Sequence, residues 1–148
     1  KVDLLSYENM KEFKQSAIQK KFQSQLLAAH EIVVVHPVWW GTPPSIMKSW
    51  VELAFWKRVA YQYSKDGKLE KLLEGRSAKV FVTCGGPAWI YKLPFLPLKS
   101  FWGLSVFEYC GIDLTEVKIC GNLNILEGEQ REKHFQKFLK TIKKSAKK

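Results

Sequence analysis

The chain has 148 residues, of which 46% are hydrophobic and 14% aromatic, and its formal net charge is +10. This composition is typical of one folded domain with a sizeable core and excludes intrinsic disorder. No apolar run approaches the ~20 residues of a membrane-spanning helix, so we expect no membrane span. Cys84, Cys110 and Cys120 have neither disulfide nor zinc-ligand spacing, and such reduced thiols predict a cytoplasmic protein.

Much of the positive charge lies near the carboxyl terminus. From position 133 onward there is no acidic residue, and we interpret residues 143–148 as a basic tail. A basic helix end is favoured by the helix dipole and is usually a solvated face, so we expect no nucleic-acid binding. The alternative, a tail that binds nucleic acid or anionic membrane, would show steep salt dependence. The lysines concerned are Lys133, Lys137, Lys140, Lys143, Lys144, Lys147 and Lys148.

Strand-like and helical patterns alternate in the first third of the chain. Val2 to Leu5 is a short alternating stretch, and Glu31 to His36 is a β-branched run that we expect to be covered on both faces, as in a parallel sheet. Between them, Phe13 to Ala29 has the spacing of a surface helix. Its predicted inner face comprises Phe13, Ala17, Ile18, Phe22, Leu26 and Ala29.

The alternation continues to the end of the chain. Thr42 can cap a helix that begins at Pro43, and the polar segment 61–75 contains Asp66-Gly67 and is predicted to be a connection with a turn. Strands are predicted over 79–83 and 117–120, and helices over 98–109 and around Phe138, the first of them ended by Gly111. This order predicts an α/β sheet with helices on both faces and right-handed crossovers.

Two unusual loops each follow a strand and precede a helical segment. The loop from His36 to Thr42 holds two adjacent tryptophans where small polar residues are expected, and the loop from Thr83 to Pro87 holds two glycines. Because the carboxyl ends of parallel strands meet at one edge, we expect both loops to face the same ligand. Indole faces and exposed backbone groups would suit a planar heteroaromatic ring with polar edges.

Both loops carry recognisable motifs. Pro37-Val38-Trp39-Trp40 is followed by Pro44, Lys48 and Trp50, and the second loop reads Thr83-Cys84-Gly85-Gly86-Pro87, with Tyr91 downstream. These stretches resemble the P-x-W-W…P-A-x-x-K-x-W segment and the T-T-G-G loop of the flavodoxin-like NAD(P)H:quinone oxidoreductases. Further resemblance occurs over residues 67–78 and 107–112, so that it covers nearly the whole chain.

The resemblance implies a single flavodoxin-like α/β domain over residues 1–148, with a doubly wound parallel sheet of order 2-1-3-4-5 and helices on both faces. It implies bound FMN, or FAD, which would pass hydride from NAD(P)H to a quinone-like acceptor. A homodimer is also implied, and we expect the apolar stretch from Trp89 to Leu98 to be buried against the second subunit.

The resemblance also implies the site residues. Tyr91 is the expected catalytic residue, and Trp89, Tyr91 and Trp102 are expected to form the substrate pocket. We expect Gly85→Val to abolish flavin binding, because a branched side chain would enter the space of the ring. The expected cofactor-binding residues are Pro37, Val38, Trp39, Trp40, Gly41, Thr83, Cys84, Gly85 and Gly86.

Three features depart from the family pattern. The first strand and the serine-containing phosphate loop of the family correspond to nothing in this chain, and we expect upstream residues to supply them unless the chain is a damaged copy. Pro97 stands where some members have a histidine that assists proton movement, which affects rate and substrate choice. His36 stands where the family usually has an aromatic residue.

Other interpretations stay open at this stage. A non-catalytic regulatory subunit, for example one ancillary to potassium efflux, would bind a protein partner through the apolar surface between Trp89 and Trp102. The tryptophan pair could also be ordinary core packing. His30, His36 and His134 have no metal-ligand spacing, and we predict no metal site. Cys84 lacks the setting of a nucleophile and is interpreted as a small residue whose backbone matters.

Overall fold

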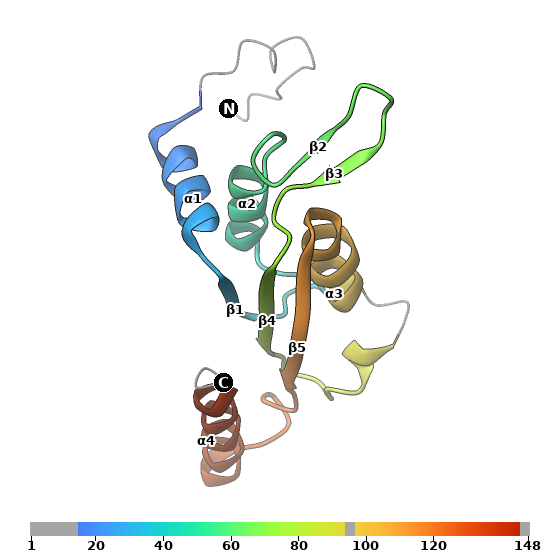
Figure 1. Cartoon of the computed structure of the whole chain (residues 1–148). Coiled ribbons are helices and arrows are strands. Elements are labelled where there is room, and N and C mark those ends of the chain that lie inside the picture. The colour runs from blue at the N-terminus through green and yellow to red at the C-terminus, as the bar shows by residue number, and fades with distance from the viewer. Residues whose placement is uncertain (1–14, 94–96, 146–148) are drawn as a thin grey trace, which may run out of the picture.

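The computed structural model describes residues 15–93 and 97–145. Strands β1 (Glu31–Pro37), β4 (Arg76–Thr83) and β5 (Ile112–Cys120) form a parallel sheet in that order, shown in Figure 1. Strands β2 (Tyr61–Tyr63) and β3 (Leu69–Lys71) form a separate antiparallel hairpin. The helical elements are α1 (Ala17–Ala28), α2 (Ser45–Ala54), η1 (Ile90–Lys92), α3 (Pro97–Ser100), η2 (Phe101–Glu108) and α4 (Gly128–Ser145).

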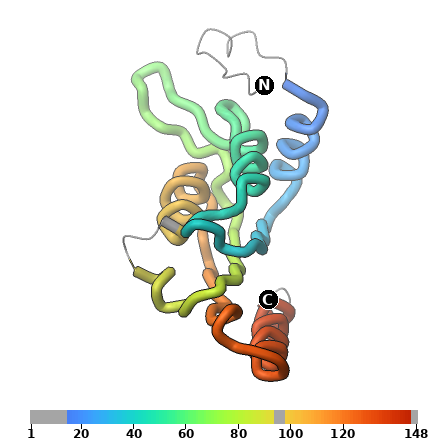
Figure 2. Tube along the Cα trace, turned by 180° about the vertical axis from the view of Figure 1, so that it is seen from behind, coloured from blue at the N-terminus to red at the C-terminus, as the bar shows by residue number. Residues whose placement is uncertain are grey.

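Helices cover the two faces of the sheet. Successive residues of a strand point to opposite faces, and in β4 Val80 and Val82 pack into the core beneath α1, α2 and η2. Phe81, between them, packs on the other side against Phe138 of α4, with ring centroids 6.3 Å apart. Figure 2 shows α4 lying apart from the other helices. The predicted α/β arrangement is therefore confirmed.

The helix α1 buries part of the predicted face together with two glutamines that were not predicted. Phe22, Leu26 and Ala29 pack in or against the core as predicted. It begins at Ala17 after the cap Ser16, whose Oγ accepts from the N–H of Gln19 at 3.2 Å. Gln19, Gln23 and Leu26 are buried, while Ile18 is exposed. Gln23 is tolerated inside because its Nε2 donates to the Leu53 carbonyl at 3.1 Å, which satisfies a group at the end of α2. Phe13 and the stretch from Val2 to Leu5 lie outside the described residues.

Strand β1 is covered on one face, which corrects the prediction of a strand buried on both. Its residues alternate between exposed and buried, and Val33 and Val35 are 46% and 54% exposed. In the described residues β1 pairs only with β4, so it lies at the edge of the sheet. The run of valines reflects β propensity here rather than burial on both sides.

Several element boundaries also differ from the predictions. Helix α2 begins at Ser45 with Pro44 at its cap position, because the Thr42 Oγ1 donates to the Trp39 carbonyl at 3.1 Å instead of capping the helix. The polar segment after α2 forms the β2–β3 hairpin around the predicted Asp66-Gly67 turn.

The carboxyl-terminal lysines continue a helix. Residues 143–145 form the last turn of α4, and residues 146–148 lie outside the described chain. The Lys79 Nζ, which is 2.7 Å from a Glu31 carboxylate oxygen, donates to the Ser145 carbonyl at 2.9 Å. Since carbonyls at a helix end lack helical partners, this contact joins the end of α4 to the middle of β4.

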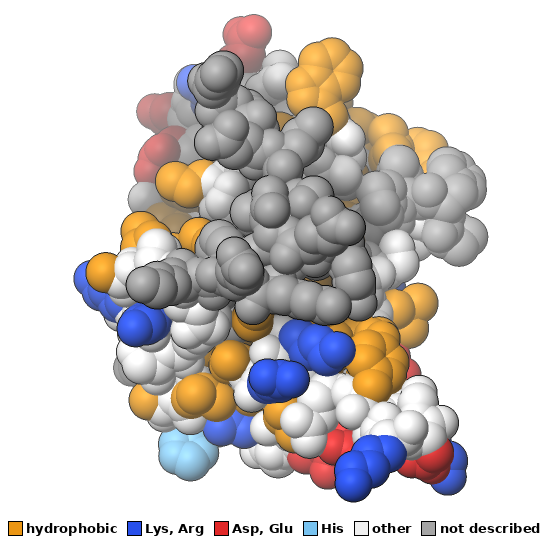
Figure 3. Space-filling view, turned by 90° about the horizontal axis from the view of Figure 1, so that it is seen from above, with side chains coloured by type: hydrophobic (Ala, Val, Ile, Leu, Met, Phe, Trp, Pro, Cys, Tyr) orange, Lys and Arg blue, Asp and Glu red, His pale blue; other side chains and the backbone are white. Residues whose placement is uncertain are grey.

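One end of the molecule shows side chains of both charges. Figure 3 views the end that carries α1 and the hairpin, where basic and acidic side chains are scattered among apolar ones. None of the described helices is long and apolar enough to cross a membrane.

Gly111 and Gly67 are a matched pair for testing the close packing between Gly111 and Glu74. Both have a positive φ, 89° and 81°, but a Cβ at Gly111 would lie 2.7 Å from the Glu74 Cγ, while nothing lies within 4 Å at Gly67. We expect Gly67→Ala to cost about 1 kcal/mol through backbone strain alone, and Gly111→Ala about 2–4 kcal/mol. Urea unfolding measures both, and equal losses would contradict the crowding at Gly111.

Candidate functional site

The carboxyl ends of the three parallel strands lie level with one another. Pro37 is in register with Thr83, and Thr83 is in register with Cys120. Beyond the last paired residue, the Val38 N–H donates to the Thr83 carbonyl at 2.7 Å. The two loops that the sequence singled out are therefore side by side at one edge, as predicted.

The tryptophan pair lies in a tight turn. The N–H of Trp39 donates to the Thr42 carbonyl and the N–H of Thr42 to the Trp39 carbonyl, both at 3.0 Å. Trp40 and Gly41 at the centre have φ of 52° and 77°, as in a type I′ hairpin turn. Such turns favour Asn, Asp and Gly, so an indole at the first central position has a steric cost of about 1–2 kcal/mol.

The two indoles lie open to solvent rather than in the core. Trp39 is 60% exposed and Trp40 is fully exposed. Core packing therefore does not explain the pair. A bulky residue held in a strained backbone conformation at an exposed position is typical of a binding site.

In the glycine loop, the backbone carbonyls of Gly85 and Gly86 accept hydrogen bonds, whereas their N–H groups have no partner among the described residues. The Gly85 carbonyl accepts from the N–H of Asn124 at 3.1 Å, and the Gly86 carbonyl accepts from the N–H of Asn122 at 2.7 Å. Within residues 15–93 and 97–145, neither Gly85 nor Gly86 donates its own N–H. These two donors are available to a ligand with hydrogen-bond acceptors along one edge.

The open space lies at Gly86. Nothing is within 4 Å of the position that a Cβ would take there, whereas a Cβ at Gly85 would lie 2.3 Å from the Asn124 Nδ2. A side chain at Gly85 would first meet Asn124. The loss of flavin binding expected for Gly85→Val stays a prediction, and Gly86 is the position where added bulk enters open space.

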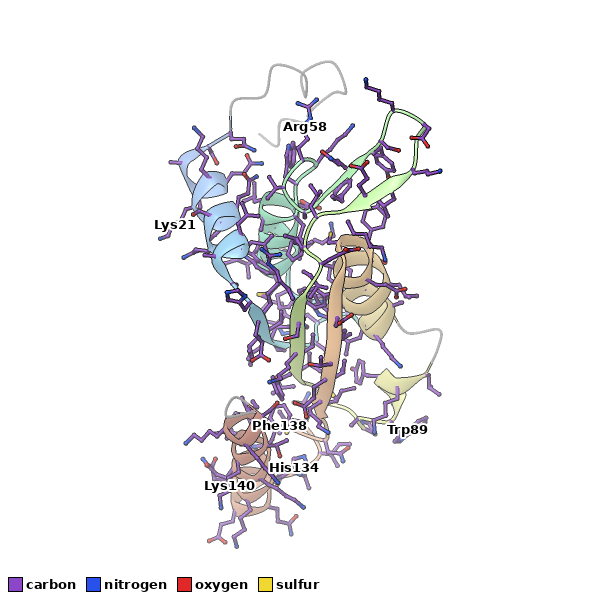
Figure 4. All side chains as sticks on the ribbon, viewed as in Figure 1. Lys21, Arg58, Trp89, His134, Phe138 and Lys140 are labelled. Atoms are coloured by element: carbon purple, nitrogen blue, oxygen red, sulfur yellow. The ribbon has the colours of Figure 1, made fainter. Side chains whose placement is uncertain are left out.

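A third loop contacts the glycine loop and was missed in the sequence. Residues 121–124 follow β5, and Leu123 and Cys84 are joined by an N–H to carbonyl bond of 3.2 Å. A Cβ at Gly121 would lie 2.4 Å from the Ala88 N, so only glycine permits this approach. The His134 Nε2 lies 3.0 Å from the Gly121 carbonyl, which connects the loop to α4 (Figure 4). The glycine directly after the strand and the two asparagines were the available signal.

The remaining predicted residues take different places. Trp89 is exposed beside η1, and Tyr91, within η1, is partly buried against the main core. Trp102 is only 1% exposed, and its Nε1–H donates to the His36 Nε2 at 2.9 Å. Trp102 thus supports the end of β1 from within the core, and it does not line an open pocket.

The three cysteines of the described chain are buried thiols. Burial, with a smaller effect from Cys120, raises the pKa of Cys84 to about 11, and burial raises the pKa of Cys110 to about 11 as well. Burial also raises the pKa of Cys120. Protonated thiols are poor nucleophiles, which supports the interpretation of Cys84 as a backbone position. Among the described residues no cluster of His, Cys, Asp and Glu could hold a metal.

A family model described as flavodoxin-like fold matches residues 2–146. The chain belongs to the flavodoxin-like fold family. Among solved structures of this fold, one from Streptococcus mutans superposes with a TM-score of 0.77 at 20% identity, covering 95% of this chain and 74% of the other. An FMN-dependent NADH-azoreductase from Bacillus anthracis, in complex with FMN, gives 0.68 at 19% identity, covering 97% and 67%.

Two curated relatives of this chain have oxidoreductase names. A protein of Haemophilus influenzae named as an uncharacterized NAD(P)H oxidoreductase is 27% identical over 135 residues, which cover 87% of this chain and 66% of the relative. An FMN-dependent NADH:quinone oxidoreductase of Pelagibacter ubique is 26% identical over 125 residues, covering 84% and 63%. The chain therefore spans slightly less than two thirds of the length of these relatives.

Relief of the strained turn provides one test of the site geometry. Because asparagine tolerates a positive φ, we expect Trp40→Asn to raise the free energy of unfolding by about 1 kcal/mol. Trp39→Asn is the matched control, since Trp39 is exposed but has no positive φ. Thermal and urea unfolding measure the effect, and a gain of equal size in both variants would argue against strain at Trp40.

The buried thiols predict how stability depends on pH. Above about pH 9 the thiols of the unfolded chain ionise, while those of Cys84 and Cys110 stay protonated in the fold. The folded state then binds more protons, so we expect the free energy of unfolding to fall as pH rises from about 9 to 11. A thiol reagent at about pH 8 should react slowly with the native chain and fully after denaturation. Rapid labelling of native Cys84 would contradict its burial.

Proposed function

We propose that this chain is the flavin-binding part of an NAD(P)H oxidoreductase that uses FMN and reduces a quinone-like acceptor. The observation that carries the proposal is that the N–H groups of Gly85 and Gly86 have no partner among the described residues, while the adjoining loop exposes the indoles of Trp39 and Trp40. The names of the relatives in Haemophilus influenzae and Pelagibacter ubique support the same activity.

The residues present fit an isoalloxazine ring. Its acceptor atoms along one edge match donors from a glycine loop whose carbonyls are already occupied, and its flat faces match indoles. The bond between Val38 and Thr83 fixes the spacing of the two loops that would hold it. When bound, FMN would accept hydride from the nicotinamide and deliver it to the acceptor.

The protein's own part would be to hold and shield the ring. Gly85 and Gly86 would donate to its edge, and the turn from Trp39 to Thr42 would cover one side. We place Trp89 and Tyr91 on the acceptor side, with Tyr91 as the residue that orients the acceptor. Trp102 would act beneath the site, through His36.

The assembly and the location are further parts of this proposal. Trp89 is 63% exposed, and a second copy of the chain packing near it would remove its indole from water and complete the acceptor side. Three reduced thiols support a cytoplasmic location. A colourless protein that binds a protein partner through this surface is the regulatory alternative.

The visible spectrum of the protein tests the proposal. We expect FMN to bind with one flavin per chain, and NAD(P)H with a simple quinone to bleach and restore the flavin absorbance. The same spectra are recorded for two forms of the protein, the chain of residues 1–148 and the chain with any upstream residues of its reading frame. Protein that ignores added FMN in both forms would favour the regulatory alternative.

A graded series at Gly86 tests the placement of the ring. Because the position opens on free space, Gly86→Ala and Gly86→Val should leave the fold intact and progressively obstruct the ring. We expect Gly86→Val to weaken FMN binding at least about tenfold, with Gly86→Ala between it and the unchanged chain. Fluorescence titration gives the affinities and thermal unfolding checks the fold. Unchanged affinity for Gly86→Val would place the ring elsewhere.

A further inference from the structure

A buried imidazole connects the tryptophan loop to the core. His36 is 3% exposed, at the carboxyl end of β1. Its Nδ1 lies 2.8 Å from the Pro37 carbonyl oxygen, and its Nε2 lies 2.9 Å from the Trp102 Nε1. Both ring nitrogens therefore have a partner.

The two partners determine a single protonation state. An indole N–H can only donate, so the Nε2 must accept and carries no proton. A backbone carbonyl can only accept, so the Nδ1 must carry the proton. The geometry thus requires a neutral imidazole with its proton on Nδ1.

The bond to Pro37 orients one peptide group at the base of the turn. The peptide between Pro37 and Val38 has its carbonyl held by His36 and its N–H held by the Thr83 carbonyl at 2.7 Å. With both polar atoms fixed, the plane of this peptide cannot rotate. That plane sets the direction in which the chain enters the turn at Trp39.

The other end of the connection is rigid. Trp102 stacks on Phe107, with centroids 5.4 Å apart and planes 22° apart, and meets Phe101 edge to face at 5.0 Å. The indole N–H is therefore held in a packed part of η2. Its bond to the Nε2 therefore holds the imidazole in one orientation, and the imidazole in turn holds the Pro37 carbonyl at the start of the loop.

We propose that His36 is a positioning residue of the site, which holds the tryptophan turn in place through its Nδ1–H while Trp102 selects the tautomer. This inference rests on the proposed function as far as the flavin is concerned. The inference gives His36 a role that the family resemblance did not supply, since the family usually has an aromatic residue at this position.

Protonation would break the connection. A proton on Nε2 would face the Trp102 N–H, so two donors would oppose each other. Burial lowers the pKa of His36 below 6.5, and the Pro37 carbonyl acts weakly in the opposite direction. Val82 of β4 is in register with His36, and Trp102 of η2 bonds to its ring. No charged side chain of the described residues contributes to this pKa shift. The neutral form is thus kept at neutral pH.

Two variants separate positioning from packing. His36→Phe retains an aromatic ring but removes both bonds, whereas the amide nitrogen of His36→Asn can still donate near the Nδ1 position. We expect amide exchange over residues 38–42 to accelerate in His36→Phe and to stay close to the unchanged chain in His36→Asn. Urea unfolding of each variant corrects for global stability.

Flavin affinity and the histidine tautomer complete the test. We expect His36→Phe to raise the FMN dissociation constant about tenfold and His36→Asn to raise it less than about threefold. Nitrogen-15 spectra of the flavin-free chain at about pH 7.5 should show the proton of His36 on Nδ1. A proton on Nε2, or equal exchange and affinity in the two variants, would overturn the inference. If the unchanged chain binds no FMN, the proposed function fails, while exchange and tautomer still decide whether His36 positions the turn.

Discussion

The hydrogen bond from the Val38 N–H to the Thr83 carbonyl is the contact on which the rest of the site depends. It extends the β1–β4 ladder one step past the sheet, so that the tryptophan turn and the glycine loop begin at a fixed separation. The third loop then closes against the glycine loop through Asn122 and Asn124. As a result, the backbone of the edge is largely satisfied by itself, and the groups left over are the N–H donors that a ligand would use.

The edge combines strained and braced features. Trp40 has a backbone conformation that costs stability, which is tolerated because the flanking bonds between Trp39 and Thr42 hold the turn closed. Beneath it, His36 and Trp102 satisfy one another in the core, where an unpaired imidazole or indole N–H would be costly. The exposed aromatic surface and the internal polar contacts thus lie at the same edge of the sheet.

The comparison of sequence and structure shows which inferences can be made from patterns. The alternation of elements predicted the α/β class, and the two loops were found because tryptophan and glycine pairs are unusual after strands. The face of α1 was predicted only in part, because Gln23 is buried by a hydrogen bond to α2, a contact that no periodicity records. Trp102 was predicted to line the substrate pocket, but it lies in the core beneath the loop. Sequence spacing alone does not distinguish an aromatic residue on the solvent side of a loop from one on its core side.

By itself, the sequence determined the class of fold, the order of its elements and the chemical nature of the two loops, because these follow from local propensity and from residue types at fixed spacing. Only the tertiary structure decided that Gly86 rather than Gly85 faces open space, that β1 has an uncovered face, and that Gly121 brings a third loop into contact. It also gave His36 its two partners from distant parts of the chain. Each of these depends on which segments meet across the sheet, and residue types in a single sequence do not say which remote segments come into contact.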